Sequence, residues 1–88
     1  MYYVYVLRSL KDGDMYIGST NDLKRRIVEH NKGEVPATES RLPFKLLYYE
    51  GYLAEGDARL RENALKLRGQ ARNHLLKRIG KSLLQSKS

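Results

Sequence analysis

The chain has 88 residues, which is enough for one small domain. Its 17 lysines and arginines outnumber 10 acidic residues, and the net charge of +7 favours a polyanionic partner, nucleic acid before an anionic membrane. The lack of cysteine excludes disulfides and thiolate metal sites, and no apolar run approaches the roughly 20 residues of a spanning helix. Because the first residues also do not resemble a signal peptide, we expect a cytoplasmic protein with no membrane partner.

The first part of the chain is predicted to form a β-hairpin. Residues 2–8 are rich in β-branched and aromatic side chains, and apolar residues on both faces indicate a central strand. The Asp12-Gly13 pair is typical of a hairpin turn. A second strand is therefore expected over residues 15–18.

The pairing of these two strands decides which side chains lie together. A two-residue loop would place Tyr5 opposite Thr20, whereas a register shifted by an even number of residues would bring Tyr5 and Tyr16 closer together. The sequence leaves both registers open. In either one, both tyrosines share a face with Leu7 and Gly18, and the glycine leaves open space beside them.

A helix is predicted over residues 21–31, where apolar residues recur four apart. Thr20 and Asn21 are suited to cap its free N–H groups, and Asp22 suits the positive end of the helix dipole. Gly33 lies just past the expected end, where a left-handed residue commonly closes a helix.

The two adjacent arginines of this helix are not equivalent. At about 100° per residue, Leu23, Ile27 and His30 fall on one side. Arg26 borders that side, whereas Arg25 faces solvent. An arginine at the boundary needs an anionic partner, either a protein carboxylate or a phosphate of a ligand. An ordinary amphipathic helix whose arginine lies over apolar surface has the same pattern, so both interpretations stay open.

The remaining elements complete a small α+β domain. A third strand is expected over residues 44–50, a second helix over 54–67 and a short third helix over 71–79. The order β-β-α-β-α-α predicts a three-stranded antiparallel sheet with helices packed on it. We assign the domain to residues 1–80 and a polar C-terminal tail to residues 81–88.

The second helix is apolar on two sides and is therefore expected to be covered on both. The two stripes are Leu60, Ala64 and Leu67, and Ala54, Ala58 and Leu65. Glu62 falls within the second stripe. A half-buried carboxylate costs several kcal/mol unless it is paired with a cation or a metal ion.

A set of chemically capable side chains is expected to converge on one region. They are Tyr5, Tyr16, Arg26, His30 and Glu62. The sequence has no Ser-His-Asp pattern, no glycine-rich phosphate loop and no cluster of metal-ligand spacing. In a strongly basic domain these residues point to phosphodiester chemistry, because a carboxylate can hold a divalent ion, an arginine can neutralise phosphate charge, and a phenol or imidazole can move a proton. Each also has a structural explanation, among them a plain Arg26–Glu62 pair.

The order and spacing of these residues resemble those of GIY-YIG nucleases, and most of all those of the small stand-alone bacterial members. Tyr3-Val4-Tyr5 stands where that family has its first motif, and Tyr16-Ile17-Gly18 matches the second. Arg26 falls on the family's catalytic arginine, and His30 on a histidine found in many members. Arg61-Glu62 matches the segment that supplies the metal-binding glutamate. The resemblance extends over residues 2–79.

The resemblance implies a metal-dependent endonuclease that hydrolyses DNA. Glu62 would bind one Mg²⁺ or Mn²⁺ ion with waters completing the shell, and Arg26 would bind the scissile phosphate. One tyrosine would accept the proton of the attacking water, and Tyr5 is slightly favoured over Tyr16. A basic nucleic-acid-binding module without catalysis, or an interaction subunit, is the alternative.

Departures from the family pattern bear on DNA binding. Ser19 stands where some members, such as the nucleotide-excision-repair nuclease subunit, have lysine. Ser19, Lys24, Arg25 and Arg26 are the predicted nucleic-acid contacts. Because no helix is left over to read bases, we expect recognition of single-stranded, flapped or otherwise distorted DNA rather than of a sequence. A role in DNA repair and a partner protein that supplies targeting are further expectations.

Overall fold

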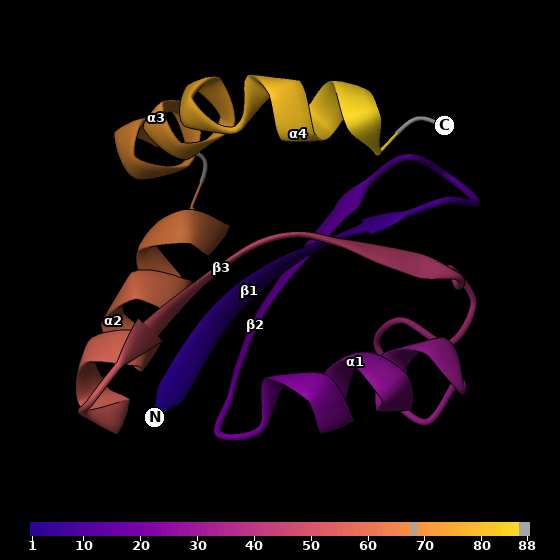
Figure 1. The fold of residues 1–88 in the computed structure, drawn as a ribbon, viewed down its shortest axis with the longest axis horizontal. Coiled ribbons are helices and arrows are strands. Elements are labelled where there is room, and N and C mark those ends of the chain that lie inside the picture. The colour runs from indigo at the N-terminus through magenta and orange to yellow at the C-terminus, as the bar shows by residue number, and fades with distance from the viewer. Residues whose placement is uncertain (68, 87–88) are drawn as a thin grey trace.

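The computed structural model of the protein describes residues 1–67 and 69–86. Its elements are β1 (Tyr2–Ser9), β2 (Met15–Thr20), α1 (Leu23–Asn31), β3 (Phe44–Tyr52), α2 (Glu55–Lys66), α3 (Gln70–Arg78) and α4 (Gly80–Gln85). The strands form one antiparallel sheet in the order β2-β1-β3, which confirms the predicted α+β fold (Figure 1). Within the described ranges, every helix is too short or too polar to span a bilayer.

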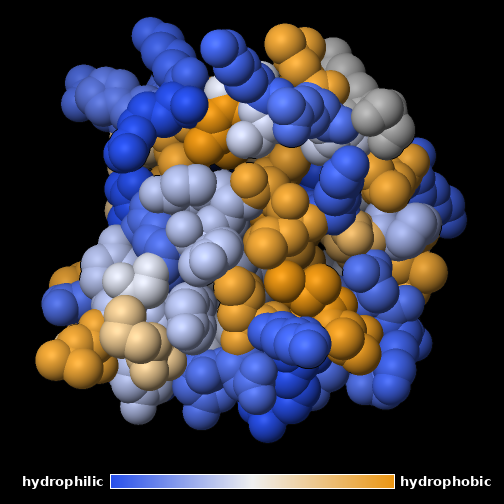
Figure 2. Space-filling model, viewed as in Figure 1, coloured by the Kyte–Doolittle hydropathy of each residue, from blue (hydrophilic) through white to orange (hydrophobic). Residues whose placement is uncertain are grey.

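The central position of β1 follows from its apolar residues on both faces. Val4 and Val6 face α2 and α3 and belong to the larger core, together with Leu65 and Leu75. Tyr5 faces the opposite side, where α1 covers a smaller core with Phe44 at its centre. Figure 1 shows α1 on one side of the sheet and α2 on the other, and Figure 2 shows apolar side chains concentrated in the middle of the face over β3.

The hairpin adopts the shifted register. Tyr5 lies opposite Gly18 and Leu7 opposite Tyr16, two residues away from the register of a two-residue loop. The turn is longer because Ser9, which is buried, accepts hydrogen bonds at its Oγ from the N–H groups of residues 11 and 12. A local side-chain interaction at the end of β1 therefore sets the strand register, and the shared face is retained.

The first helix begins at Leu23, and its N-cap lies one residue after the predicted caps. Asp22 is the N-cap, since its carboxylate accepts from the N–H of Arg25 at 3.1 Å. The assignment of the cap to Thr20 or Asn21 is wrong, because the Thr20 hydroxyl instead accepts from the N–H of Asp22. Gly33 has φ of +76° and donates to the His30 carbonyl, so its predicted left-handed role is confirmed.

The second helix is covered on one side only. Ala58 and Leu65 are buried against the sheet, as predicted, but Leu60 is 71% exposed and Leu67 is 69% exposed. The expectation that both stripes are covered is wrong. The chain turns after Lys66, and α3 adds Leu75 and Ile79 to the core under the sheet instead of packing on the outer stripe.

The C-terminal segment is more structured than a polar tail. Residues 80–85 form α4, and Ser86 is buried, with its hydroxyl accepting a hydrogen bond from Arg8 Nη1 at 3.0 Å. Arg8 also donates to the carbonyl of Leu83, which ties α4 to β1. The last part of the predicted tail, residues 87–88, lies outside the described residues.

The absence of a side chain at Gly18 lets the Tyr5 ring lie close to β2, and a substitution at Gly18 tests this. A Cβ atom there would lie 2.5 Å from the Tyr5 hydroxyl and 2.7 Å from its Cζ. We expect Gly18→Ala to lower the free energy of unfolding by about 1–3 kcal/mol, as overpacking does. Urea unfolding followed by circular dichroism measures this.

The matched control is Gly56→Ala in α2, where a Cβ meets nothing within 4 Å. Alanine favours helix over glycine, so this variant should gain about 0.5 kcal/mol. Equal stability of Gly18→Ala and wild type would contradict the placement of Tyr5 across Gly18.

Candidate active site

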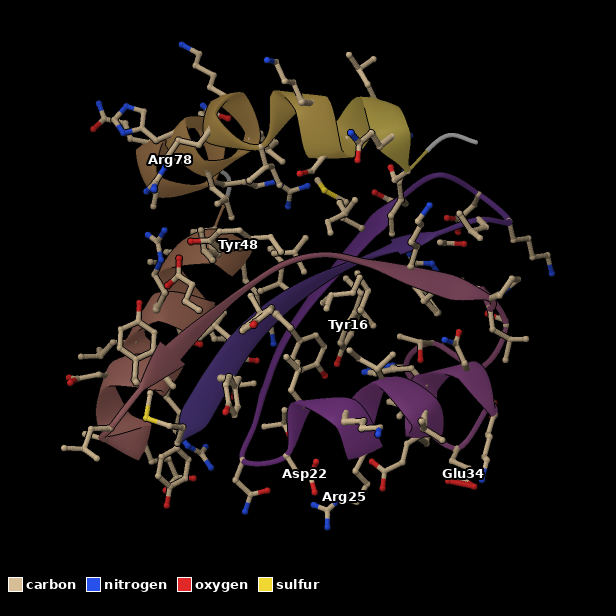
Figure 3. The ribbon with its side chains drawn as sticks, in the orientation of Figure 1. Tyr16, Asp22, Arg25, Glu34, Tyr48 and Arg78 are labelled. Atoms are coloured by element: carbon tan, nitrogen blue, oxygen red, sulfur yellow. The ribbon has the colours of Figure 1, made fainter. Side chains whose placement is uncertain are left out.

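Three of the predicted site residues meet between the sheet and α1. Tyr5 comes from β1, Tyr16 from β2 and His30 from the buried side of α1, and Figure 3 shows Tyr16 pointing into this space. The His30 ring centroid lies 5.6 Å from that of Tyr5 and 5.0 Å from that of Tyr16. The two tyrosine rings are 6.4 Å apart. The shared face and the helix side predicted from periodicity therefore do bring these rings together.

A chain of hydrogen bonds starts at the Tyr5 hydroxyl. This hydroxyl lies 2.8 Å from His30 Nε2, and His30 Nδ1 lies 2.8 Å from Thr38 Oγ1. The Thr38 hydroxyl donates to the carbonyl of Val35, so its oxygen accepts from Nδ1–H. In the tautomer that carries its proton on Nδ1, His30 leaves Nε2 to accept the Tyr5 proton, and the chain then runs in one direction.

Thr38 is the residue of this hydrogen-bonded chain that sequence reasoning missed. It is completely buried and orients His30, yet it lies in an irregular loop between α1 and β3. No periodicity applies in such a loop, so the sequence cannot say which of its residues turn inward. The only available signal is general: a buried histidine needs a second polar partner.

The protonation states of the pair follow from burial. Burial raises the pKa of Tyr5 to about 12, although the nearby Arg26 guanidinium lowers it in part. Burial lowers the pKa of His30, and the positive charge of Arg26 lowers it further. At neutral pH, Tyr5 is therefore a neutral donor and His30 a neutral acceptor.

The two arginines of α1 differ as the helical wheel predicts. The Arg26 side chain is 37% exposed and the Arg25 side chain is 63% exposed, and Figure 3 shows Arg25 pointing away from the sheet. Arg26 Nη1 binds Glu29 Oε1 at 3.1 Å, so the anionic partner inside the protein is a carboxylate one turn later. The same guanidinium interacts with the Tyr5 phenol. The Arg26 side chain thus lies between the buried rings and the protein surface.

Glu62 projects from α2, which packs on the face of the sheet opposite to α1. Its side chain is 17% exposed, pairs with Lys66 Nζ at 2.7 Å and accepts from Ser19 Oγ at 2.7 Å. Burial would raise the pKa of Glu62, but the hydrogen bonds from Lys66 and Ser19 hold it below the ordinary value. Its partner is not Arg26, and Ser19, a predicted DNA contact, bonds to Glu62 through its hydroxyl.

A cleft of about 350 Å³ opens at the end of β2, between the first turns of α1 and α2. Ser19, Arg25 and Arg26 line one part of it, and Arg59 lines another. Lys24, also predicted to bind nucleic acid, lies on the outer face of α1 and does not line this cleft. Glu29 and Glu55 also line the cleft and pair with its guanidinium groups, so an anionic ligand would take the place of these carboxylates.

The residues that could hold a metal ion are few. Across residues 1–67 and 69–86, no three His, Cys, Asp or Glu side chains cluster as a metal cage. Glu62 is ionised, partly exposed and an oxygen donor, which fits Mg²⁺ or Mn²⁺ held by one carboxylate, waters and a substrate phosphate. It does not fit a metal that requires a complete set of protein ligands.

Comparison with known proteins agrees with this geometry. The family model of the GIY-YIG catalytic domain matches residues 1–75. A UPF0213 protein of Streptococcus pneumoniae is 43% identical over 65 residues, which is 73% of this chain and 65% of that protein. A UPF0213 protein of Halobacterium salinarum is 35% identical over 77 residues, which is 86% of this chain and 99% of that protein.

A solved structure is similar in fold as well. The solution NMR structure of a UPF0213 protein from Bacillus halodurans has a TM-score of 0.53 and 32% sequence identity, and the match covers 90% of this chain and 85% of that one. Similar sequence, fold and motif order thus coincide over most of the chain. The chain therefore belongs to the GIY-YIG catalytic domain family, within a superfamily of nucleases, and is similar to the UPF0213 proteins.

Proposed function

We propose that the protein is a divalent-metal-dependent nuclease that hydrolyses phosphodiester bonds of DNA and selects DNA by its structure. The observation that carries this proposal is the directed chain from Tyr5 through His30 to Thr38, with Arg26 beside its phenol end. Burying a phenol and an imidazole is costly unless each finds a partner, a cost that an apolar core would avoid. The proposal is supported by membership in a nuclease superfamily.

The proposed role of Arg26 is to bind the scissile phosphate. Its guanidinium lies at the boundary between the buried rings and the cleft, and is positively charged at all relevant pH values. The Glu29 contact is a pair within one helix and contributes little, so a phosphate can replace the carboxylate at low cost. Negative charge that develops on the phosphate is stabilised there.

The proposed proton path uses both members of the buried pair. As water attacks the phosphorus, its proton passes to the Tyr5 oxygen while the Tyr5 proton passes to His30 Nε2. His30 becomes an imidazolium whose Nδ1–H stays on Thr38. This concerted transfer avoids a free phenolate, which a pKa of about 12 makes unfavourable at neutral pH. Tyr16, beside both rings, positions the water or the phosphate.

Glu62 is the proposed metal-binding residue. A Mg²⁺ or Mn²⁺ ion, when bound, polarises the phosphoryl oxygens as a Lewis acid. Glu62 is ionised and is bonded to Ser19 and to Lys66, whose side chain is 50% exposed, so its carboxylate can accept a cation. The helices support selection of DNA by its structure rather than by its sequence. Helix α1 contributes to the site and α2 and α3 pack on the sheet, so these helices are not available to read bases. A cytoplasmic location, a role in repair and a targeting partner stay predictions.

The first test is the carboxylate. Glu62→Gln should lower metal-dependent cleavage by at least about 100-fold, because the metal contributes several kcal/mol to the transition state. Labelled flaps, forks, nicked duplexes and single strands are incubated with Mg²⁺ or Mn²⁺, with EDTA as the blank. The control is Glu39→Gln, a glutamate exposed in the loop before β3, which should leave the rate unchanged.

Metal-dependent cleavage that persists in Glu62→Gln would contradict the metal assignment. Salt-sensitive binding by the wild type with no cleavage of any substrate would favour the binding-module alternative.

The two arginines provide a matched comparison. Arg26→Ala should reduce turnover by about 100-fold or more while weakening DNA binding only modestly, since one phosphate contact among several is lost. Arg25→Ala should weaken binding and lower the salt dependence with turnover largely retained. Single-turnover rates and fluorescence anisotropy at two salt concentrations separate these effects. Equal losses of turnover in both variants would show that the assignment of roles to the two helix faces is wrong.

The proton path predicts a pH dependence and a role for Thr38. His30 must be neutral to accept a proton, and its pKa is lowered, so cleavage should be constant above about pH 6.5 and fall only below that value. Thr38→Val keeps the volume but removes the acceptor of Nδ1–H, and should lower kcat about tenfold with KM little changed. Thr38→Ser should restore the rate. A Val variant with wild-type kcat and an unaltered acid limb would exclude the relay.

A further inference from the structure

Two tyrosines, Tyr3 and Tyr49, form an accessible aromatic pair on the sheet face that also carries Tyr5. Their ring centroids are 6.0 Å apart in an edge-to-face arrangement at 66°. Tyr49 is 53% exposed and Tyr3 is half-buried. Over the described residues, the hydroxyl of neither one hydrogen-bonds to another protein group. The fold therefore leaves these rings accessible and their polar ends unused.

The strand register connects this tyrosine pair to the candidate active site. Thr20, Tyr3 and Gly51 are paired across the three strands and form one row on the same face. Thr20 lines the cleft that contains Arg26. In the neighbouring row, Tyr49 lies directly opposite Tyr5. The pairing thus places Tyr3 beside a residue that lines the cleft, with Tyr49 one row further along the same face.

The cover over this face is incomplete at the end where the pair lies. Figure 1 shows that β1 begins, and β2 and β3 end, at the side of the sheet beyond the first turn of α1. The core under α1 contains Leu7, Phe44 and Leu46, which lie toward the other end. Gly51, opposite Tyr3, is exposed and adds no side chain above the sheet, and among the described residues the nearest other group at that point is the end of the Met1 side chain, which is 60% exposed and can move aside. A flat ligand has access to the tyrosine faces here.

We propose that the tyrosine pair stacks an unpaired base of the DNA strand whose phosphate Arg26 binds, an inference that rests on the proposed function for the position of that phosphate. Proteins that hold single strands combine cations along the backbone with aromatic rings under the bases. Arg25, Arg26 and Arg59 supply the cations in the cleft. Two strand spacings, about 10 Å, separate β2, whose end borders the cleft, from β3, which carries Tyr49.

A stacked base also explains which DNA the protein would select. Every base has an aromatic face, so stacking is tolerant of sequence. A base inside an intact duplex is already stacked and cannot reach the sheet, whereas a base in a flap or single strand can. The pair therefore confers preference for unpaired DNA without any contact to base edges.

The test measures binding rather than cleavage. Fluorescein-labelled single strands and blunt duplexes of one sequence are titrated in EDTA at fixed salt, which prevents turnover. We expect Tyr49→Ala and Tyr3→Ala to weaken single-strand binding about tenfold each and duplex binding less than about twofold. Tyr49→Phe keeps the ring and should bind as wild type does. Leu60→Ala removes another exposed apolar side chain, on the outer stripe of α2, and should change neither affinity.

Equal losses on single strands and duplexes, or no loss on either, would overturn the stacking proposal. Loss of affinity in Leu60→Ala as well would show that the effect is not specific to the tyrosines. Because the titration contains no metal, its outcome is independent of catalysis. If single-strand binding depends on the tyrosines but no substrate is cleaved in the separate assay with Mg²⁺ or Mn²⁺, stacking is retained and the nuclease proposal is rejected. Flap cleavage that is unaffected in Tyr49→Ala would retain the nuclease proposal and reject stacking.

Discussion

The site depends on the placement of the Tyr5 phenol across the backbone of Gly18. Only a residue without a side chain opposite Tyr5 leaves room for the ring to lean toward α1 and bond to His30. A phenol and an imidazole in an apolar core each cost several kcal/mol unless their polar atoms are bonded. They satisfy each other, and Thr38 satisfies the remaining ring nitrogen. The hairpin, α1 and the loop after it are joined by this chain.

The two charged groups of the proposed mechanism each have an ion-pair partner on their own helix. Arg26 pairs with Glu29 three residues later, and Glu62 pairs with Lys66 four residues later. Such pairs contribute only a few tenths of a kcal/mol. The proposed phosphate-binding group, Arg26, and the proposed metal-binding group, Glu62, are therefore both paired in the free protein. A phosphate can replace the carboxylate on Arg26, and a metal ion can replace the ammonium group on Glu62.

The position of α2, and with it of Glu62, depends on the buried side of β3. Glu50 accepts hydrogen bonds from Tyr48 at 2.7 Å, from Tyr52, and from Arg61 Nε at 3.0 Å. Arg61 is the neighbour of Glu62 on α2, so this cluster ties the helix to the edge strand. Figure 3 shows Tyr48 on the side of the sheet that faces away from α1. One residue of the Arg61-Glu62 pair is thus structural and the other faces the cleft side of β2.

Strand alternation and helix periodicity are local properties of the chain, so the sequence was enough to predict the three strands, the first three helices, the central position of the first strand and the contrast between Arg25 and Arg26, but not α4 in the predicted tail. The tertiary structure decided everything that depends on distant partners. It fixed the Ser9 hydroxyl, which donates to the distant Arg41 carbonyl while it accepts from the turn that sets the register, and it brought in Thr38 from a loop without periodicity. It also left Leu60 exposed, although its spacing is that of a core residue, because a periodic pattern defines a helix face but not what covers that face.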